Sequence, residues 1–315
     1  MDQKDVGGVA IVMPMFSPRR ESIDRLQGLA AQARQVILVD DNPAENRDWS
    51  DAIGTAPNVR VIRHATNRGI AAALNTGVRE VLDAPEIEYI ITLDQDSELP
   101  ADYVEKFLCE RAAKDLSNQT TGILCPERMD GRRVATRRNG AAPYDPMQSG
   151  MFIPLSTFRK VGLFDESLFI DAVDSDFALR TRKSGLDVEF VRDTDLQHGL
   201  GEQIPATIFG RNLRWRGATK FFSSHSATRL YYIARNHLIV NVRFLGFDPA
   251  WVMRRFYEDL KLVGINIVFG PEKPKLGLAV SAGLLHGAMR KAGKIPPRLS
   301  RRLGAKRPAD PPRSG

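Results

Sequence analysis

The chain has few cysteines and no long apolar segment. Only Cys109 and Cys125 occur among its 315 residues, too few for a disulfide framework or a cysteine metal cluster. No run of about 18 consecutive apolar residues is present, so the sequence predicts no membrane-spanning helix. Residues 1–5 also lack the basic-then-apolar order of a signal peptide. These absences favour a reducing compartment, and we expect a cytoplasmic protein.

The charge of the chain is unevenly distributed. The formal net charge is +7, but the part from Trp251 onward has 14 Lys and Arg against 4 Asp and Glu, which leaves −3 for the first 250 residues. A basic end on a near-neutral body indicates an anionic partner, either phospholipid or nucleic acid. We expect no nucleic acid, because the basic part lacks interleaved aromatic residues and the body lacks a recognition motif.

A Gly-x-Gly-x-x-Gly motif is also absent after the first predicted strand, which argues against a dinucleotide-binding dehydrogenase. Short apolar runs instead alternate with segments of helical periodicity, a pattern typical of βαβ units. Strands are predicted at 9–13, 36–39, 59–62, 89–93, 121–126 and 188–191, and helices at 21–34, 70–82, 158–164 and 225–236. The sequence therefore predicts an α/β fold with a mostly parallel central sheet.

Two carboxylates stand directly after the strand predicted at 89–93. Alternation along an extended chain points Asp94 and Asp96 to the same side, at the carboxyl end of the strand, where open α/β sheets bind ligands. Two hard oxygen donors there suit Mg²⁺ or Mn²⁺, and such an ion can bridge the phosphates of a nucleotide. The plainer alternative is a solvated turn, because Asp-x-Asp alone is a weak motif.

Two further strand ends carry polar residues. Asp40 and Asp41 follow one strand, and Asn67 and Gly69 follow the next. Taken alone, the aspartates are better explained by a turn; in the functional interpretation, one of them accepts the imide N–H of a pyrimidine base. Gly69 permits close backbone approach, and the helix that it opens can direct its N-terminus at an anion.

A second acidic cluster precedes a predicted helix. Asp171, Asp174 and Asp176 fall within six residues. Capping a helix needs only one such residue, so three mutually repelling carboxylates indicate a site that tolerates the cost for chemistry. His198 lies further along the chain; a lone histidine is more often structural, but its neutral imidazole suits Mn²⁺ better than Mg²⁺.

The helix predicted at 225–236 carries Arg229 and Arg235. It either docks on the core as a plain amphipathic helix or uses one of these arginines to neutralise phosphate. Beyond Trp251, apolar residues at helical spacing are interspersed with basic ones, as in helices that lie in a membrane interface. The alternative is a helical appendage that packs on the domain or on a second subunit, which leaves homo-oligomerisation open.

Five motifs together resemble one enzyme family. They are Ile91–Ser97, Phe169–Asp174, Arg180, His198–Gly201 and Arg229–Asn236. By their order and spacing, residues 9–236 resemble glycosyltransferase family 2, and within it the bacterial rhamnosyltransferase branch. The resemblance implies a GT-A fold, an inverting mechanism and a nucleotide-sugar donor, in this branch usually dTDP-L-rhamnose.

The resemblance also sets the expected domains and site. A catalytic domain is expected over 1–245, with a nucleotide-binding half (1–97) and an acceptor half (98–245), followed by a basic helical extension (246–300) and a disordered tail (301–315). The expected site comprises Asp40, Asp41, Asn67, Gly69, Asp94, Arg229 and Arg235 for the donor; Asp94, Asp96 and His198 for the metal; Ser149, Gly150, Asp171 and Asp176 on the acceptor side; and Asp174 as catalytic base, with Asp176 as the alternative base.

The chemistry of sugar transfer asks for these residue types independently. A departing nucleoside diphosphate develops negative charge that a cation neutralises, and the acceptor hydroxyl must lose its proton to a base. We expect a saccharide acceptor, lipid-linked at the inner face of the membrane, in cell-surface polysaccharide or glycolipid biosynthesis. The alternatives are transfer of galactofuranose or N-acetylglucosamine from a UDP-sugar, and a sugar nucleotidyltransferase.

Overall fold

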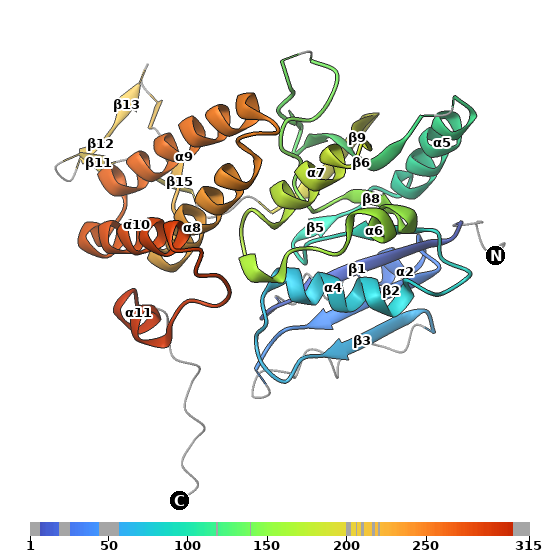
Figure 1. The fold of residues 1–315 in the computed structure, drawn as a ribbon, viewed down its shortest axis with the longest axis horizontal. Helices are drawn as coiled ribbons and strands as arrows, with labels where there is room; N and C mark the ends of the chain where they lie inside the picture. Colours follow the sequence, from blue (N-terminus) through green and yellow to red (C-terminus); the bar gives the residue numbers. More distant parts are fainter. Residues whose placement is uncertain are drawn as a thin grey trace, which may run out of the picture. The chain divides into compact units, whose positions relative to one another are not determined.

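The computed structural model describes residues 7–18, 26–43, 57–117, 119–138, 140–199, 203–205, 207–208, 211–215, 218–219 and 221–304. Chain contacts divide the molecule into two compact units (Figure 1). The sheet unit comprises Met1–Phe169 with Val173–Gly199, and the helical unit comprises Ile170–Ala172 with Leu200–Gly315. The boundary predicted at residue 245 therefore falls inside the helical unit.

The sheet unit is built on a nine-stranded mixed sheet of order β3-β2-β1-β4-β8-β6-β9-β5, with β7 paired to β6. The strands are β1 (Val9–Met15), β2 (Gln35–Asp40), β3 (Val59–Arg63), β4 (Tyr89–Thr92), β5 (Ser97–Glu98), β6 (Thr121–Met129), β7 (Arg132–Arg133), β8 (Met151–Pro154) and β9 (Asp187–His198). The pairs β3-β2, β2-β1, β1-β4 and β6-β9 are parallel, as predicted, whereas β8 runs antiparallel to both β4 and β6.

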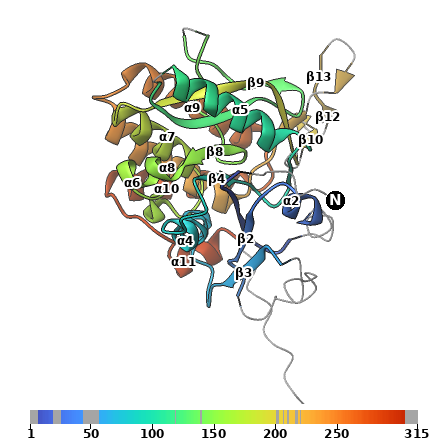
Figure 2. The ribbon, with the colours of Figure 1, turned by 90° about the vertical axis from the view of Figure 1, so that its right-hand side faces the viewer.

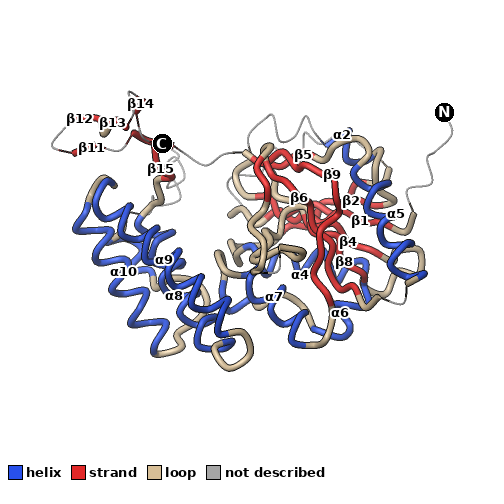
Figure 3. Tube along the Cα trace, turned by 90° about the horizontal axis from the view of Figure 1, so that it is seen from above, coloured by secondary structure: helices blue, strands red, loops and turns tan. Residues whose placement is uncertain are grey.

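Helices cover both faces of this sheet. They are α2 (Leu26–Ala30), α4 (Ile70–Val81), α5 (Tyr103–Leu116), α6 (Leu155–Val161) and α7 (Val173–Lys183), with the 3₁₀ helix η1 (Glu166–Leu168) before α7. Figures 2 and 3 show α2 and α5 on one face and α4, α6 and α7 on the other. The apolar runs are therefore buried from both sides, which is why their sequences do not alternate between apolar and polar residues.

Successive residues of β1 serve the two faces of the sheet. Ile11 and Met13 lie in the core that α2 and α5 cover, together with Phe107 of α5. Val12, between them, lies against Gly77 of α4, where an added Cβ would overlap the valine side chain. A glycine in the middle of a helix is normally destabilising, so its presence here reflects the close approach of α4 to the strand.

Several element boundaries differ from the sequence-based expectations. The first strand continues through Pro14 to Met15, and β6 and β9 extend well beyond the predicted segments 121–126 and 188–191. The helix predicted at 158–164 begins at Leu155 and ends where Gly162 adopts a positive φ of 86°. Register shifts between β6 and β9 maintain their pairing over the added length.

The helical unit contains four helices, α8 (Ala227–Phe244), α9 (Pro249–Phe269), α10 (Lys273–Ala288) and α11 (Pro297–Arg302), among the residues that the structure describes. Short strand pairs precede them: β10 (Gln203–Pro205) with β15 (Phe221–Ser223), β11 (Thr207–Ile208) with β12 (Arg211–Asn212), and β13 (Arg214–Trp215) with β14 (Ala218–Thr219). None of the described helices is long and apolar enough to cross a membrane.

Small residues let α10 pack closely on α8. A Cβ added at Gly283 would lie 2.6 Å from the Tyr231 carbonyl oxygen, and one added at Gly287 would lie 2.9 Å from that of Arg235. Within the extension predicted over 246–300, α10 therefore packs directly on α8. Of the predicted tail, residues 305–315 lie outside the described residues, and residues 301–302 belong to α11.

Replacing Gly77 tests the packing of α4 on β1. We expect Gly77→Ala to lower the free energy of unfolding by about 1–3 kcal/mol, because the methyl group overpacks against Val12. The matched control is Gly28→Ala in α2, which meets no atom within 4 Å and should stabilise by roughly 0.5–1 kcal/mol. Urea unfolding of the two variants should give shifts of opposite sign; equal shifts would contradict the packing.

Candidate active site

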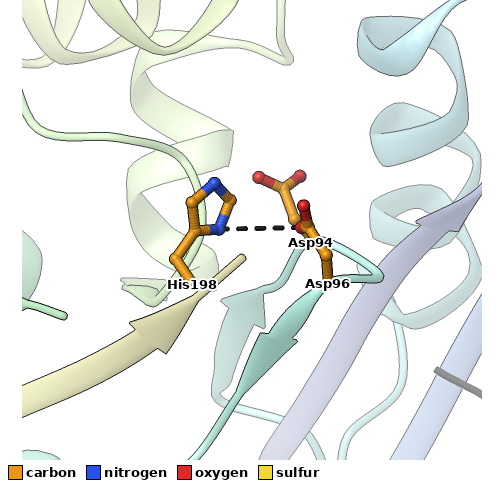
Figure 4. A group of neighbouring side chains, drawn as sticks. All are labelled: Asp94, Asp96 and His198. Atoms are coloured by element: carbon orange, nitrogen blue, oxygen red, sulfur yellow. Dashed lines mark ion pairs between the residues drawn. The ribbon is translucent and has the colours of Figure 1, made fainter. Parts of the chain in front are cut away.

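The predicted metal residues lie together at the carboxyl end of β4. Asp94 and Asp96 follow this strand, and His198 is the last residue of β9, which pairs with β5 at Ser97. One candidate ligand atom from each of Asp94, Asp96 and His198 lies within 4.8 Å of the other two. Figure 4 shows the three side chains pointing toward one another, with His198 Nδ1 at 3.6 Å from Asp96 Oδ1.

The segment before β8 holds Asp94 in place. Because β8 runs antiparallel to β4, its first residue pairs with the last residue of β4, which brings Gln148 and Ser149 beside Asp94. The Gln148 side-chain amide donates to Asp94 Oδ1, and the Asp94 N–H donates to Ser149 Oγ at 3.0 Å. Ser149, predicted on the acceptor side, thus contacts a metal-ligand candidate directly.

Gly150 completes the same turn. Its φ is +84°, and an added Cβ would lie 2.7 Å from the Tyr103 hydroxyl oxygen, so only glycine fits here without strain. Its N–H donates to the Thr92 carbonyl at 2.7 Å, and its own carbonyl accepts from the Tyr103 hydroxyl at 2.6 Å. These contacts give Gly150 a structural role in fixing the turn; an acceptor contact for it stays a prediction.

A pair of serine hydroxyls fixes the orientation of His198. Ser97 Oγ lies 2.7 Å from His198 Nδ1 and 2.7 Å from Ser149 Oγ. If the imidazole proton is on Nδ1, the ring donates to Ser97 and presents a bare Nε2, which is the form that binds a cation. The hydroxyl pair therefore connects the two sides of the cluster, Asp94 through Ser149 and His198 through Ser97.

This donor set fits a divalent cation. Two carboxylates and one imidazole, with the partial exposure that leaves room for waters and phosphate oxygens, match the ligands of Mn²⁺, and the carboxylates alone match Mg²⁺. The alternative, two carboxylates close together with no cation, leaves their mutual repulsion uncompensated. The geometry therefore supports the predicted metal site.

The two aspartates after β2 have different surroundings. Asp41 is saturated: its carboxylate accepts from the Arg68 and Gly69 N–H groups, both at 2.8 Å, and lies 2.8 Å from His64 Nδ1. Asp40 is fully buried and accepts through Oδ1 from Asn42, while its Oδ2 has no hydrogen-bond partner among the described residues. Of the two aspartates, Asp40 is therefore the one whose Oδ2 can accept a hydrogen bond from the base of a nucleotide.

Gly69 is required by both conformation and space. Its φ is +91°, and an added Cβ would lie 2.5 Å from the Phe169 carbonyl oxygen. Its N–H also lies 3.1 Å from Asn67 Oδ1, so Asn67 helps to shape the turn that opens α4. Local structure alone thus explains why Asn67 and Gly69 occupy these positions, and their contact with a nucleotide stays a prediction.

Glu166 connects η1 to α4 close to that turn. It accepts hydrogen bonds from Asn75 and Arg79, both at 3.0 Å, and from Arg68 at 3.3 Å. Burial alone would raise the pKa of Glu166, but the hydrogen bonds from Asn75 and Arg79 and the charges of Arg79 and Arg68 hold this pKa below its usual value. Glu166 is therefore a charged anchor that places Arg68 beside the opening of α4.

The acidic residues at the start of α7 divide into two kinds. Asp176 is completely buried and pairs with Arg180, whose Nε lies 2.7 Å from Asp176 Oδ2. Arg180 in turn donates to the carbonyls of Val161 and Leu163, so this pair anchors α7 to the chain before it. Asp174 is only half-buried, and its Oδ1 accepts from the Ser175 N–H at 2.9 Å. Asp174 is thus the more accessible of the two candidate bases.

Asp171, Arg229 and Arg235 belong to the helical unit. Arg229 pairs with Asp171 at 3.3 Å, and half of its side chain stays exposed. Arg235 is only 1 % exposed and is bonded within its own unit, so its geometry favours a structural role and gives no support to the donor contact predicted for it. A donor contact for Arg229 and an acceptor contact for Asp171 stay predictions.

Several residues around the cluster were not predicted. Gln148 and Ser97 hold the metal candidates, and His64 and Asn42 hold the two aspartates after β2. Gln148 stands beside the predicted Ser149 and Ser97 ends a quoted motif, but nothing in their local pattern shows which strands become neighbours. His64 gave no signal at all, since an isolated histidine after a strand is common.

Comparisons with known proteins give one family. Residues 11–141 match the model of glycosyl transferase family 2. The dTDP-rhamnosyl transferase RfbF of Shigella flexneri is 28% identical over 244 residues, which cover 73% of this chain and 78% of the relative. The uncharacterized protein MJ1222 of Methanocaldococcus jannaschii is 32% identical over 100 residues, or 31% of this chain and 39% of the relative.

One solved structure supports the same fold. The crystal structure of S. aureus TarS 1-349 in complex with UDP-GlcNAc covers 93% of this chain and 83% of its own chain, with a TM-score of 0.51 and 14% identity. The chain spans half the length of a longer TarS structure, matched with a TM-score of 0.48. The predicted resemblance and the predicted α/β fold, of the GT-A type, are confirmed.

Removing the Ser97 hydroxyl tests the support of the cluster. We expect Ser97→Ala to weaken Mn²⁺ binding by about 10- to 100-fold, the usual cost of losing a residue that orients a metal-bound histidine. Electron paramagnetic resonance of free Mn²⁺ measures this without any nucleotide. The control is Ser156→Ala on the exposed side of α6; equal affinities for both variants would show that Ser97 orients nothing.

Proposed function

We propose that this chain, whose residues 11–141 match the glycosyl transferase family 2 model, transfers L-rhamnose from dTDP-L-rhamnose to a saccharide acceptor with inversion at the anomeric carbon. The observation that carries the proposal is the convergence of Asp94, Asp96 and His198 at the carboxyl end of β4. Ligands of open α/β sheets bind at this edge, and a nucleotide diphosphate is the ligand that needs such a cluster.

The cluster serves the departure of the nucleotide. Asp94, Asp96 and His198 would hold Mg²⁺ or Mn²⁺, which when bound neutralises charge that develops on the diphosphate. Gln148, Ser149 and Ser97 keep the ligands in one arrangement, so little reorganisation is needed when the donor binds. Such pre-placed stabilisation is typically worth about 100- to 1000-fold in rate for a single donor group.

Asp174 is the proposed base. The acceptor hydroxyl attacks the anomeric carbon as the bond to the diphosphate breaks, and its proton must pass to a carboxylate on the face opposite the leaving group. Asp176 is unsuited, because it is completely buried and paired with Arg180. Asp174 is partly accessible, which supports its role in taking the proton.

Asp40 is the proposed contact for the base of the nucleotide. Its free Oδ2 can accept the imide N–H that thymine and uracil share, whereas Asp41 is committed to His64, Arg68 and Gly69. Asn67 and Gly69, at the opening of α4, are proposed to line the same pocket. This contact does not separate dTDP from UDP, so the choice of dTDP-L-rhamnose rests on the RfbF relative.

A donor screen tests the function directly. Purified protein is incubated with Mn²⁺ and a panel of nucleotide sugars, and the released nucleoside diphosphate is measured. We expect dTDP release from dTDP-L-rhamnose to exceed release from every UDP-sugar. Preferred release of UDP from UDP-galactofuranose or UDP-N-acetylglucosamine would replace the proposed donor, and pyrophosphate release from a sugar phosphate and a nucleoside triphosphate would favour a nucleotidyltransferase.

Removing the charge of Asp174 separates binding from turnover. We expect Asp174→Asn to lower kcat by about 100- to 10,000-fold, the usual contribution of a general base. The dissociation constant for dTDP, measured by calorimetry, should stay close to that of the wild type. Asp176→Asn is the comparison: we expect it to lower the thermal stability of the protein and to leave dTDP affinity nearly unchanged. Unchanged turnover in Asp174→Asn would show that Asp174 is not the base.

The exposed face of α9 supports a membrane-surface location for the acceptor. Met253, Phe256, Tyr257 and Leu260 follow one another at helical spacing, and all are more than half exposed, Tyr257 by 67%. Exposed aromatic side chains at this density are unusual unless something covers them. Because the chain beyond Trp251 carries a large excess of basic residues, we propose that an anionic lipid surface is the partner.

Polar substitution of this face tests lipid binding. Phe256→Ser with Tyr257→Ser should weaken cosedimentation with vesicles of phosphatidylglycerol and phosphatidylcholine at least about tenfold, because two aromatic side chains no longer enter the interface. The control is Leu116→Ser, which replaces an even more exposed apolar residue, in the sheet unit. Binding of the wild type that is no stronger to anionic than to neutral vesicles would contradict the proposal.

A further inference from the structure

The chain just before Asp174 adopts an unusual backbone conformation. Phe169, Asp171 and Ala172 all have positive φ, at 67°, 63° and 62°, and none of them is glycine. The ψ of Phe169 is −61°, a γ-turn conformation that is rare and strained. Non-glycine residues hold such angles only where their surroundings enforce them, so contacts around this turn must stabilise it.

Asn236 of α8 supplies those contacts. Its side-chain amide donates to two carbonyls of the turn, to Ile170 at 2.6 Å and to Asp171 at 3.0 Å. Asn236 is completely buried, so no water competes for these hydrogen bonds. Arg229, two helical turns earlier in α8, pairs with the Asp171 carboxylate at 3.3 Å. The turn is therefore attached to α8 by its backbone as well as by its side chain.

The side chain of Asn236 is itself fixed by Arg235. The Arg235 Nε donates to Asn236 Oδ1 at 2.8 Å, which leaves the amide nitrogen of Asn236 to face the turn. The guanidinium group lies over two rings, 5.5 Å from the Tyr231 centroid and 4.9 Å from that of Tyr232. It also donates to the Gly293 carbonyl at 2.6 Å. Arg235 is thus buried and bonded to several partners within the helical unit.

The chain after α10 closes the same cluster. The Ile295 N–H donates to the Tyr232 hydroxyl at 2.7 Å, next to the Gly293 contact of Arg235. Burial raises the pKa of Tyr232 to about 12, so this hydroxyl stays neutral beside the guanidinium group. Residues 293–295, which are distant in the sequence, therefore help to hold the side chains that fix the turn.

We propose that Arg235 and Asn236 are positioning residues for Asp174, which they orient by fixing the strained turn three residues ahead of it. This rests on the proposed role of Asp174 as base, and it replaces the donor contact predicted for Arg235. Loss of the pair should misplace the carboxylate rather than weaken donor binding, because neither residue touches the nucleotide in this account.

Hydrogen exchange tests the turn without any turnover assay. In Asn236→Ala, backbone amides of the peptide covering 168–174 should exchange at least about tenfold faster than in the wild type, since the turn is no longer held. The control is Asn241→Ala, which removes another buried asparagine of α8, more than one helical turn further along the helix. Unchanged exchange in Asn236→Ala would overturn the proposal even if the enzyme proved to use another donor.

Kinetics of a double variant then separate positioning from general damage. Asn236→Ala should lower kcat about 100-fold, as expected for a misplaced reactive group, with the KM for the donor within about twofold. Adding Ala172→Gly should recover about tenfold of kcat, because glycine adopts the positive φ without strain. A loss that appears in KM instead, or a double variant no better than Asn236→Ala, would contradict the positioning role.

Should Asn236→Ala fail to fold, Arg235→Lys provides the same test. Lysine keeps the charge but cannot bond Asn236 and Gly293 together, so the exchange of 168–174 should still rise and kcat should still fall. Exchange and kcat equal to those of the wild type in Arg235→Lys would show that the guanidinium group does not support the turn. If no nucleotide sugar is turned over by the wild type, the proposed function fails while the exchange result still decides the contact.

Discussion

The repulsion between Asp94 and Asp96 is the constraint on which the rest of the sheet unit depends. Two carboxylates one residue apart at a sheet edge repel each other, and hydrogen-bond donors, a cation or water at the half-exposed Asp96 side chain compensate their charge. The structure supplies part of this compensation from a distant part of the chain, through the Gln148 amide that donates to Asp94. The negative charge that remains uncompensated attracts a cation. A bound cation in turn attracts a diphosphate.

The antiparallel insertion of β8 into the sheet is what makes this arrangement possible. A parallel strand at this position would begin at the opposite edge and would leave Gln148 and Ser149 far from Asp94. Because β8 runs the other way, its first residues meet the end of β4. The short β5 pairs with the end of β9, and this pairing places His198 at the same edge. The fold thus brings three separate chain segments to one charged position.

Local pattern sufficed for the part of the molecule whose contacts are local. The apolar runs, the glycine that opens α4 and the carboxylates after β4 all carry their own signal, and the structure has them as predicted. The direction of β8 and the roles of Gln148 and Ser97 depend on which strands become neighbours, and no local pattern encodes that choice. The burial of Arg235 likewise depends on long-range packing, and an arginine in a motif gives no local sign of it.

The central claim is that a divalent cation sits between Asp94, Asp96 and His198 and contacts the diphosphate of the nucleotide. A crystal of the protein grown with Mn²⁺ and dTDP tests it most directly, through the anomalous signal of manganese. The account predicts one strong anomalous peak at about 2.0–2.3 Å from a ligand atom of each carboxylate, with a diphosphate oxygen on its other side. Bound dTDP with no peak at this position would contradict it.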